Sequence, residues 1–136
     1  MSLHSPHSFN LKGFNIGIII CADIRNPTLT RALAGSPHNC DVIIQPAAFS
    51  RDISFRTWNS FRETRAVENS VYFVAINYAG SYYGNSAIIE PWVDENHEPE
   101  TLGCEEGILV KTIQRCVLDK VRTTCPYHRQ LMKESL

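Results

Sequence analysis

Cys21 has the setting that a cysteine nucleophile needs. It follows the most apolar run of the chain, Ile16 to Ile20, and a polar, sharply turning segment, Ala22 to Pro27, comes directly after it. A buried strand that ends in a thiol and then turns into a helix brings the sulfur to the edge of a sheet, where backbone N–H groups point toward it. The pattern predicts nucleophilic attack by the Cys21 thiol, with nearby N–H groups stabilising an oxyanion.

The thiol needs an activator, because the pKa of an unperturbed cysteine is ~8.5 and only a few per cent is thiolate at neutral pH. Residues 1–20 contain neither Asp nor Glu and only one lysine, Lys12. We therefore expect the activating group to come from downstream or from another chain. An inert, buried Cys21 is also an open interpretation of the residues alone, since cysteine is among the most buried residue types.

Short apolar runs that alternate with helical patterns predict the elements that position this thiol. Phe14–Cys21 is a nearly continuous β-branched run, as in a strand buried on both faces. Pro27 and Gly35 are helix start and stop signals that predict a helix over Thr28–Ala34. Asp41–Gln45 is a second short strand, and the strand–helix–strand order predicts a parallel pair. Further strands are expected at Val71–Asn77, Ser86–Glu90 and Ile108–Ile113.

A longer helix is predicted over Ser54–Asn69, where one face begins aromatic and ends charged. The residues of that face are Trp58, Phe61, Arg65 and Glu68. Arg65 and Glu68 are three residues apart, which predicts a partly buried ion pair. The remaining expectations are a tail or loop over residues 1–9, an acidic loop over Asp94–Glu106, a short helical turn over Asp119–Thr124 and a C-terminal tail over residues 126–136.

Composition predicts one compact domain, because the 136 residues are 43% hydrophobic and 20% charged. The formal net charge of -1 provides no long-range field for nucleic acid or for an anionic membrane, so neither partner is expected. The five cysteines are an odd number without a CxxC pair, which argues against a disulfide framework or a zinc site. With no basic leader and no long apolar stretch, we expect a cytoplasmic protein without metal or cofactor.

Five motifs in sequence order resemble those of the nitrilase superfamily, the carbon–nitrogen hydrolases. Gly17–Pro27 resembles the nucleophile segment, and Asp41–Phe49, DVIIQPAAF, is similar to the next strand and its pocket loop. The other three matches are Arg65–Asn77, Gly84–Trp92 and Glu106–Leu109. The resemblance runs from about Phe9 to the C-terminal region, and five ordered motifs are far more specific than one.

The resemblance implies the C-terminal portion of an α-β-β-α sandwich, with residues 1–136 as a single partial domain. It implies that Cys21 attacks the carbon of a small amide, carbamoyl compound or nitrile, and that the Ala22 N–H helps to hold the oxyanion. It also implies a substrate pocket lined by three residues, Arg25, Phe49 and Asn77. For Arg25, a salt bridge that supports the turn is an open alternative.

The catalytic glutamate and lysine of the family precede the cysteine, and this chain has no matching positions, so we expect no activity from the chain alone. Glu68 is not expected to be the general base. The partner is expected to be a second copy or an N-terminal-half polypeptide. Two alternatives stay open: a non-catalytic assembly module with the same fold, and an unrelated cysteine hydrolase that uses His97 or His128.

Overall fold

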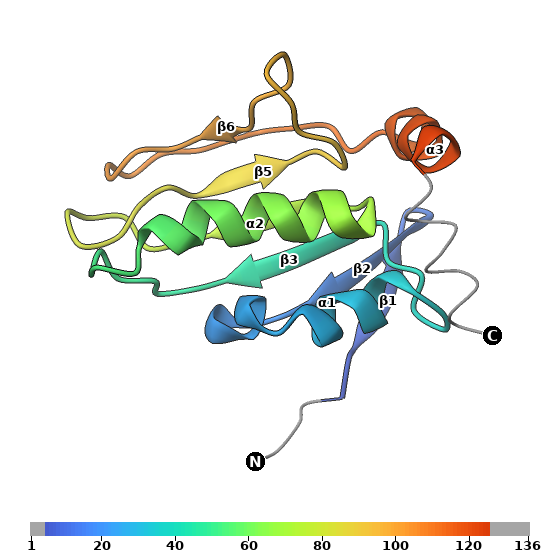
Figure 1. The fold of residues 1–136 in the computed structure, drawn as a ribbon, viewed down its shortest axis with the longest axis horizontal. Coiled ribbons are helices and arrows are strands. Elements are labelled where there is room, and N and C mark those ends of the chain that lie inside the picture. Colours follow the sequence, from blue (N-terminus) through green and yellow to red (C-terminus); the bar gives the residue numbers. More distant parts are fainter. Residues whose placement is uncertain (1–4, 126–136) are drawn as a thin grey trace.

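The computed structural model of the chain describes residues 5–125, which form one six-stranded sheet with helices (Figure 1). The strands are β1 (Ser8–Leu11), β2 (Phe14–Ile18), β3 (Val42–Pro46), β4 (Tyr72–Ile76), β5 (Ala87–Ile89) and β6 (Glu100–Thr101). The helices are the 3₁₀ helix η1 (Cys21–Arg25) and the α-helices α1 (Pro27–Ala34), α2 (Arg56–Asn69) and α3 (Arg115–Thr124). The strands are neighbours in sequence order, from β1 to β6.

The centre of the sheet is parallel, as the strand–helix–strand order predicts. β2 pairs in parallel with β3, and β3 with β4, whereas the outer strands pair antiparallel. Helices α1 and α2 make the two crossovers. The carboxyl ends of β2, β3 and β4 therefore share one edge of the sheet, where binding residues gather in open α/β sheets.

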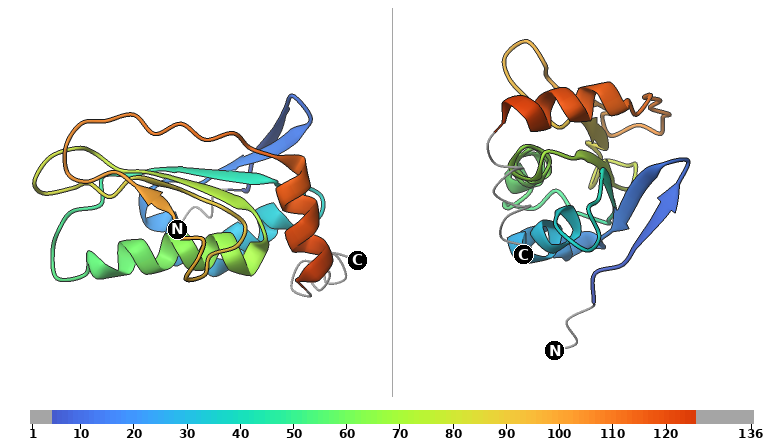
Figure 2. Two further views of the ribbon diagram at one scale, coloured as in Figure 1. Left: turned by 90° about the horizontal axis from the view of Figure 1, so that it is seen from above. Right: turned by 90° about the vertical axis from the view of Figure 1, so that its right-hand side faces the viewer.

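Helices α1 and α2 cover one face of the sheet (Figures 1 and 2). Helix α1 begins at Pro27 because the Asn26 side chain accepts a hydrogen bond from the Thr28 N–H at 3.1 Å. The main core lies under these helices and combines fully buried side chains of the sheet, such as Ile43 and Phe73, with Trp58 of α2. Burial of these large apolar groups is the main stabilising term of this layer.

The other face of the sheet is only partly covered. Near the amino ends of the strands, Leu118 of α3 packs on a second cluster that includes Val42 and Tyr72. Toward the carboxyl edge, an apolar patch remains exposed or half-buried, and we call it the open face. It consists of Ile18, Ile20, Ile44, Val74 and Ile76. Apolar side chains gathered in this way usually mark a surface that another element covers.

Helix α3 is fastened to the sheet by a buried carboxylate. Asp41, 5% exposed at its side chain, accepts hydrogen bonds from Arg115 and Arg122 at 2.8 Å each. Burial alone would raise the pKa of Asp41, but the hydrogen bonds from both guanidinium groups and from the Asn15 N–H outweigh it and hold that pKa below its usual value. Arg122 also donates to the Cys40 carbonyl at 3.1 Å. The ionised side chain of Asp41 therefore helps to hold α3 on the sheet.

The structure corrects several expected boundaries. The tail or loop expected over residues 1–9 already contains the start of β1, because Ser8 and Phe9 pair with β2. The predicted helical turn is the end of the longer α3, and β6 interrupts the expected acidic loop. The predicted strand Ile108–Ile113 is wrong: Ile108 and Val110 are 88% and 82% exposed, and within residues 5–125 the segment has no ladder partner. The expected C-terminal tail lies outside the described residues.

Across residues 5–125, none of the helices combines the length and apolarity that a bilayer crossing requires.

Candidate active site

Cys21 opens η1, just beyond the carboxyl end of β2. The strand ends earlier than expected, at Ile18, although the Ile19 N–H still donates to the Ile44 carbonyl at 3.0 Å. The φ of Cys21 is 48°, in the left-handed region that residues other than glycine rarely occupy. Such strain persists only where surrounding contacts enforce it, and it clusters at functional sites. The side chain is half-buried, so a reagent can reach the thiol at the sheet edge.

The turn that carries the cysteine is held by contacts on both sides. The Ile20 N–H donates to Oδ2 of Asp23 at 2.9 Å, and the Asp23 N–H donates to the Ile20 carbonyl at 3.0 Å. The Ile24 side chain is fully buried in the core, and its carbonyl accepts from Nε of Arg65 at 2.9 Å. Short-range and long-range contacts together therefore fix η1.

The predicted ion pair between Arg65 and Glu68 is confirmed, with 2.9 Å between Nη1 and Oε1. The Arg65 side chain is only 6% exposed, so it is a buried cation that needs this partner. The sequence did not predict that Arg65 also reaches η1 through the Ile24 carbonyl. The Glu68 carboxylate neutralises Arg65, and Arg65 in turn binds the backbone of η1. Glu68 therefore supports the turn through Arg65.

Gln45 is a second residue that sequence reasoning missed. Its side chain is fully buried at the carboxyl end of β3, and its Nε2 donates to the Cys21 carbonyl at 2.7 Å. The available signal was a polar residue at an inward position of the apolar run Asp41–Gln45. A buried polar side chain in a strand usually has a specific hydrogen-bond partner, and here that partner is the backbone of Cys21.

Ala22 is exposed at the rim, next to Cys21. It belongs to the first turn of η1, where backbone N–H groups have no acceptor within the helix. Its N–H can therefore donate to an oxygen placed beside the thiol. The predicted role of this group at an oxyanion stays a prediction.

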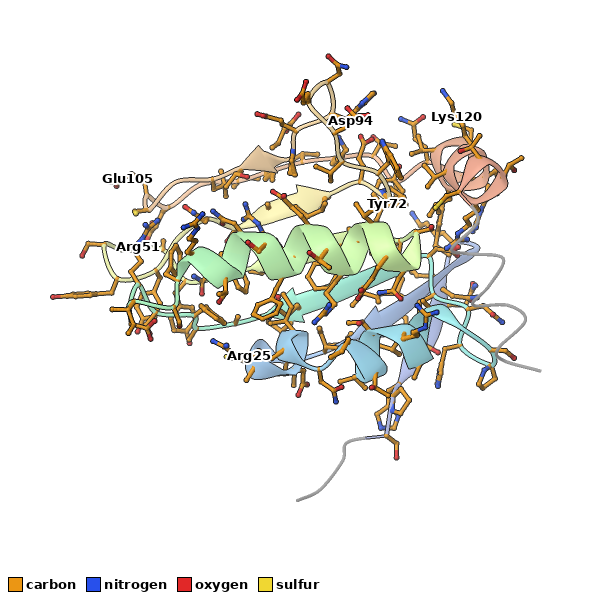
Figure 3. The ribbon with its side chains drawn as sticks, in the orientation of Figure 1. Arg25, Arg51, Tyr72, Asp94, Glu105 and Lys120 are labelled. Atoms are coloured by element: carbon orange, nitrogen blue, oxygen red, sulfur yellow. The ribbon has the colours of Figure 1, made fainter. Side chains whose placement is uncertain are left out.

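The Arg25 guanidinium packs on aromatic rings. Its Cζ lies 5.2 Å from the ring centroid of Phe49 and 5.6 Å from that of Phe61 on α2. Figure 3 labels Arg25 beside η1, on the helix-covered side of the sheet. Among the ion pairs of the described residues, none involves Arg25. The rings thus hold a cation whose charge is not neutralised by a carboxylate within ion-pair distance.

Phe49 and Asn77 come together, but both turn toward the interior. The Phe49 ring is 7% exposed and lies 5.2 Å from the ring of Trp58. Oδ1 of Asn77 accepts from the Phe49 N–H at 2.7 Å, and its Nδ2 donates to the carbonyls of Phe49 and Gly84, each at 2.9 Å. Both amide hydrogens of Asn77 are therefore in use within the protein. The predicted substrate contacts of these two residues stay predictions.

His97 lies at the other end of the molecule from the cysteine. It pairs with Asp94 at 2.6 Å and lines a cavity of about 620 Å³ together with residues of α3, including Lys120. Figure 3 shows Asp94 and Lys120 at this end, far from Arg25. His97 is therefore not placed to deprotonate Cys21. Within residues 5–125, no group of three or more His, Cys, Asp or Glu side chains gathers as metal ligands would.

Comparison with known proteins gives three informative matches. The chain is 32% identical over 122 residues to deaminated glutathione amidase of Synechocystis sp., covering 82% of this chain and 42% of that protein. It is 28% identical over 129 residues to omega-amidase NIT2 of Homo sapiens, covering 90% and 45%. The crystal structure of Saccharomyces cerevisiae Nit3, a nitrilase superfamily member, matches with a TM-score of 0.78 and 25% identity over 90% of this chain and 46% of that one.

These matches agree with the fold described above, in which an α-covered sheet carries a strained cysteine at its carboxyl edge. The chain spans less than half the length of these relatives. A family model described as carbon-nitrogen hydrolase matches residues 4–123, nearly the whole chain. The chain therefore belongs to the carbon–nitrogen hydrolase family, within the nitrilase superfamily.

Proposed function

We propose that this chain is the nucleophile-bearing half of an amidase-type carbon–nitrogen hydrolase that cleaves a small amide, carbamoyl compound or nitrile. The observation that carries the proposal is the left-handed, half-buried Cys21 at the carboxyl edge of the sheet, beside the N–H of Ala22. The amidase names of the two curated relatives support the reaction class.

For an amide, the reaction has two halves that share the same site. The Cys21 sulfur bonds to the carbonyl carbon, and the oxygen takes the negative charge beside the Ala22 N–H. The C–N bond then breaks, and ammonia leaves with a proton from a general acid. A base-activated water attacks the resulting thioester, and the products are a carboxylic acid and the regenerated thiol.

We infer that the acid–base groups belong to a second layer that packs on the open face. The family resemblance puts a glutamate and a lysine before the cysteine, and residues 1–20 contain no glutamate. Ile18 and Ile20 of the open face are 45% and 59% exposed and lie three and one positions before Cys21, so a layer that covers them also lies close to the thiol. An N-terminal-half polypeptide would supply this layer with its acid–base groups, whereas a second copy would cover the open face but has the same sequence and so no glutamate in residues 1–20.

Arg25 is proposed to select substrates that carry a negative charge. Its guanidinium rests on the rings of Phe49 and Phe61 and has no carboxylate within ion-pair distance in the described part of the chain. A guanidinium held by rings keeps its hydrogen-bond donors for a bidentate contact with a carboxylate. Phe49 supports this cation, and Asn77 supports Phe49 through its backbone.

Turnover assays test the proposal directly. The chain alone is incubated with small amides, N-carbamoyl amino acids and nitriles, and then with a nitrilase-superfamily N-terminal half that carries the glutamate and the lysine. We expect ammonia release only in the mixture, and its loss in Cys21→Ala but not in the exposed-cysteine control Cys116→Ala.

Two results would change the conclusion. Ammonia release by the chain alone would show that the acid–base groups are already present. If the mixture forms a stable complex in which Cys21 reacts with iodoacetamide no faster than Cys116, the chain is a non-catalytic assembly module.

A further inference from the structure

Gln45 is buried at a cost that an apolar residue would avoid. It follows Ile43 by two positions in β3, so both side chains point to the helix-covered face, and both are 0% exposed. Nε2 of Gln45 donates to the Cys21 carbonyl at 2.7 Å, whereas its Oε1 has no hydrogen-bond partner among the described residues. Since leucine or methionine would fill this space without burying an unpaired amide oxygen, the distinctive contribution of Gln45 is its N–H.

The orientation of the Gln45 amide follows from chemistry. A carbonyl oxygen accepts hydrogen bonds and cannot donate one, so the reversed amide would place two acceptors 2.7 Å apart. Only the amide nitrogen can face the Cys21 oxygen. The contact links residues 24 positions apart, in β3 and η1, and it therefore sets the rotation of the Cys21 backbone relative to the sheet.

The carbonyl that Gln45 holds and the N–H of Ala22 belong to one peptide group. A peptide group is planar, and in the trans form its C=O and N–H point in opposite directions. Ser36-Pro37 is the only cis bond in the described residues, so the bond between Cys21 and Ala22 is trans. Gln45 holds the oxygen on the buried side, and this directs the Ala22 N–H outward, to the rim where the thiol lies.

We propose that Gln45 is the positioning residue that aims the Ala22 N–H at the oxyanion formed by attack of Cys21. The hydrogen bond also polarises the shared peptide group, which makes its N–H a stronger donor. This inference rests on the proposed function, because it concerns the oxyanion of the same reaction. It assigns Gln45 no contact with substrate.

Two reagents distinguish an effect of Gln45 on the oxyanion donor from an effect on the general reactivity of the Cys21 thiol. With p-nitrophenyl acetate, the Cys21 thiolate bonds to the carbonyl carbon, an oxyanion forms, and p-nitrophenolate leaves with the electron pair of the broken C–O bond. With iodoacetamide, the sulfur displaces iodide from a CH₂ group and no oxyanion forms. The proton of the thiol goes to buffer in both cases. The ratio of the two rates at Cys21 therefore cancels the thiolate fraction and reports the oxyanion donor.

The rates are measured on the full chain by mass spectrometry of the peptide that contains Cys21, with exposed Cys116 as internal reference. In the wild-type chain we expect an acylation-to-alkylation ratio at Cys21 at least ~10-fold above that at Cys116. In Gln45→Met, that ratio should fall about 10-fold while alkylation changes less than about twofold. Ile43→Val, on the same face of β3, is the matched control and should keep the wild-type ratio.

Gln45→Glu provides a second test if the methionine variant does not fold, as judged by circular dichroism. The ionised carboxylate of this variant only accepts hydrogen bonds, so it repels the Cys21 carbonyl, whereas the protonated acid donates to it. Because burial raises the pKa of a carboxyl at this fully buried position to roughly 8–9, the ratio at Cys21 should be low at about pH 10 and recover as the pH falls toward 7. The wild-type ratio should not change with pH.

The outcomes distinguish the inference from the function on which it rests. If wild-type Cys21 shows the same ratio as Cys116, there is no oxyanion site, and both the proposed function and the role of Gln45 fail. If the wild-type ratio is high and Gln45→Met keeps it, or Gln45→Glu shows no pH dependence, only the role of Gln45 is refuted.

Discussion

Substitution of Asp41 should weaken the packing of α3 on the sheet. The Asp41 side chain is 5% exposed and pairs with Arg122, itself 15% exposed, and with Arg115, which is 43% exposed. Asp41→Asn removes the charge but keeps the size. The amide nitrogen that replaces one carboxylate oxygen would face donors only: Arg115 and Arg122 at the Oδ1 position, or Arg115 and the Asn15 N–H at the Oδ2 position.

The expected loss of folding free energy in Asp41→Asn follows from how deeply each arginine partner is buried. Breaking a buried ion pair by removing one charge costs ~3–5 kcal/mol, because the other charge stays buried without compensation. The pair with half-exposed Arg115 adds less than ~1 kcal/mol. Since the asparagine oxygen can still accept the two hydrogen bonds of the carboxylate oxygen that it replaces, we expect the lower end of this range, a loss of about 3 kcal/mol of folding free energy. For a domain of this size, this lowers the melting temperature by about 10 °C.

Thermal unfolding followed by circular dichroism measures this loss, with Asp94→Asn in an exposed loop as the control. Asp94 has hydrogen-bond partners, Trp92 and His97, but is not buried in the core, so its substitution should change the melting temperature by less than ~2 °C. Equal shifts in the two variants would refute the reasoning, because burial would then not decide the cost.

The pH dependence of the free energy of unfolding tests independently whether the ionised Asp41 stabilises the folded chain. The pKa of Asp41 is below its usual value in the folded chain, chiefly because the hydrogen bonds of the two arginines outweigh its burial. The unfolded chain therefore binds the proton more tightly, and the contribution of Asp41 is fully present above the unfolded pKa of ~3.9. It is lost as the pH falls through the lower, folded pKa. The gap between wild type and Asp41→Asn should shrink accordingly, and a constant gap down to pH 2 would contradict this account.

Two further predictions concern buried groups. Burial, with a smaller effect of the neighbouring Asp41 carboxylate, raises the pKa of Cys40 to about 12. At pH 8, iodoacetamide should therefore label Cys116 but not Cys40 in the folded chain, and both thiols in urea. Labelling of folded Cys40 at the rate of Cys116 would rule out its burial. Asn77→Ala should cost about 2–4 kcal/mol in urea unfolding, because it leaves the N–H and carbonyl of buried Phe49 unpaired, whereas Asn96→Ala on the surface should cost less than ~0.5 kcal/mol.

The sequence predicted the central strands from their apolar runs, but not how far each face is covered. In runs such as Val42–Gln45 and Val71–Ile76, helices cover one face, whereas the second face is covered by α3 only near the amino ends of the strands and Ile76 is 46% exposed. The run Ile108–Ile113 is also mostly apolar, but it has no strand partner among residues 5–125, and its Ile108 is 88% exposed. A local apolar pattern indicates that a segment can be buried. Whether that segment pairs as a strand depends on segments that are distant in the sequence.

Of the candidate site, the sequence predicted the position of Cys21 at the sheet edge and the family that the motifs resemble. Cys21 stands out because the change from apolar run to polar turn is local. The contacts of Gln45 and Arg65 with η1 join residues 24 and 41 positions apart, which no local pattern reveals. The inward turn of Phe49 has the same origin, because its direction depends on the side-chain amide of Asn77, 28 positions away.

The open face would couple the stability of this protein to the assembly proposed above. Ile18, Ile20 and Ile76 would lose their contact with water on binding the proposed second layer, so such a layer would be a ligand of the folded chain. A ligand that binds only the folded state stabilises it by ~2.7 kcal/mol when present at 100 times its dissociation constant. The supply of the proposed second layer would therefore influence how much of the chain is folded. Any assembly partner that covers Ile18 and Ile20 also controls access to the thiol that follows them.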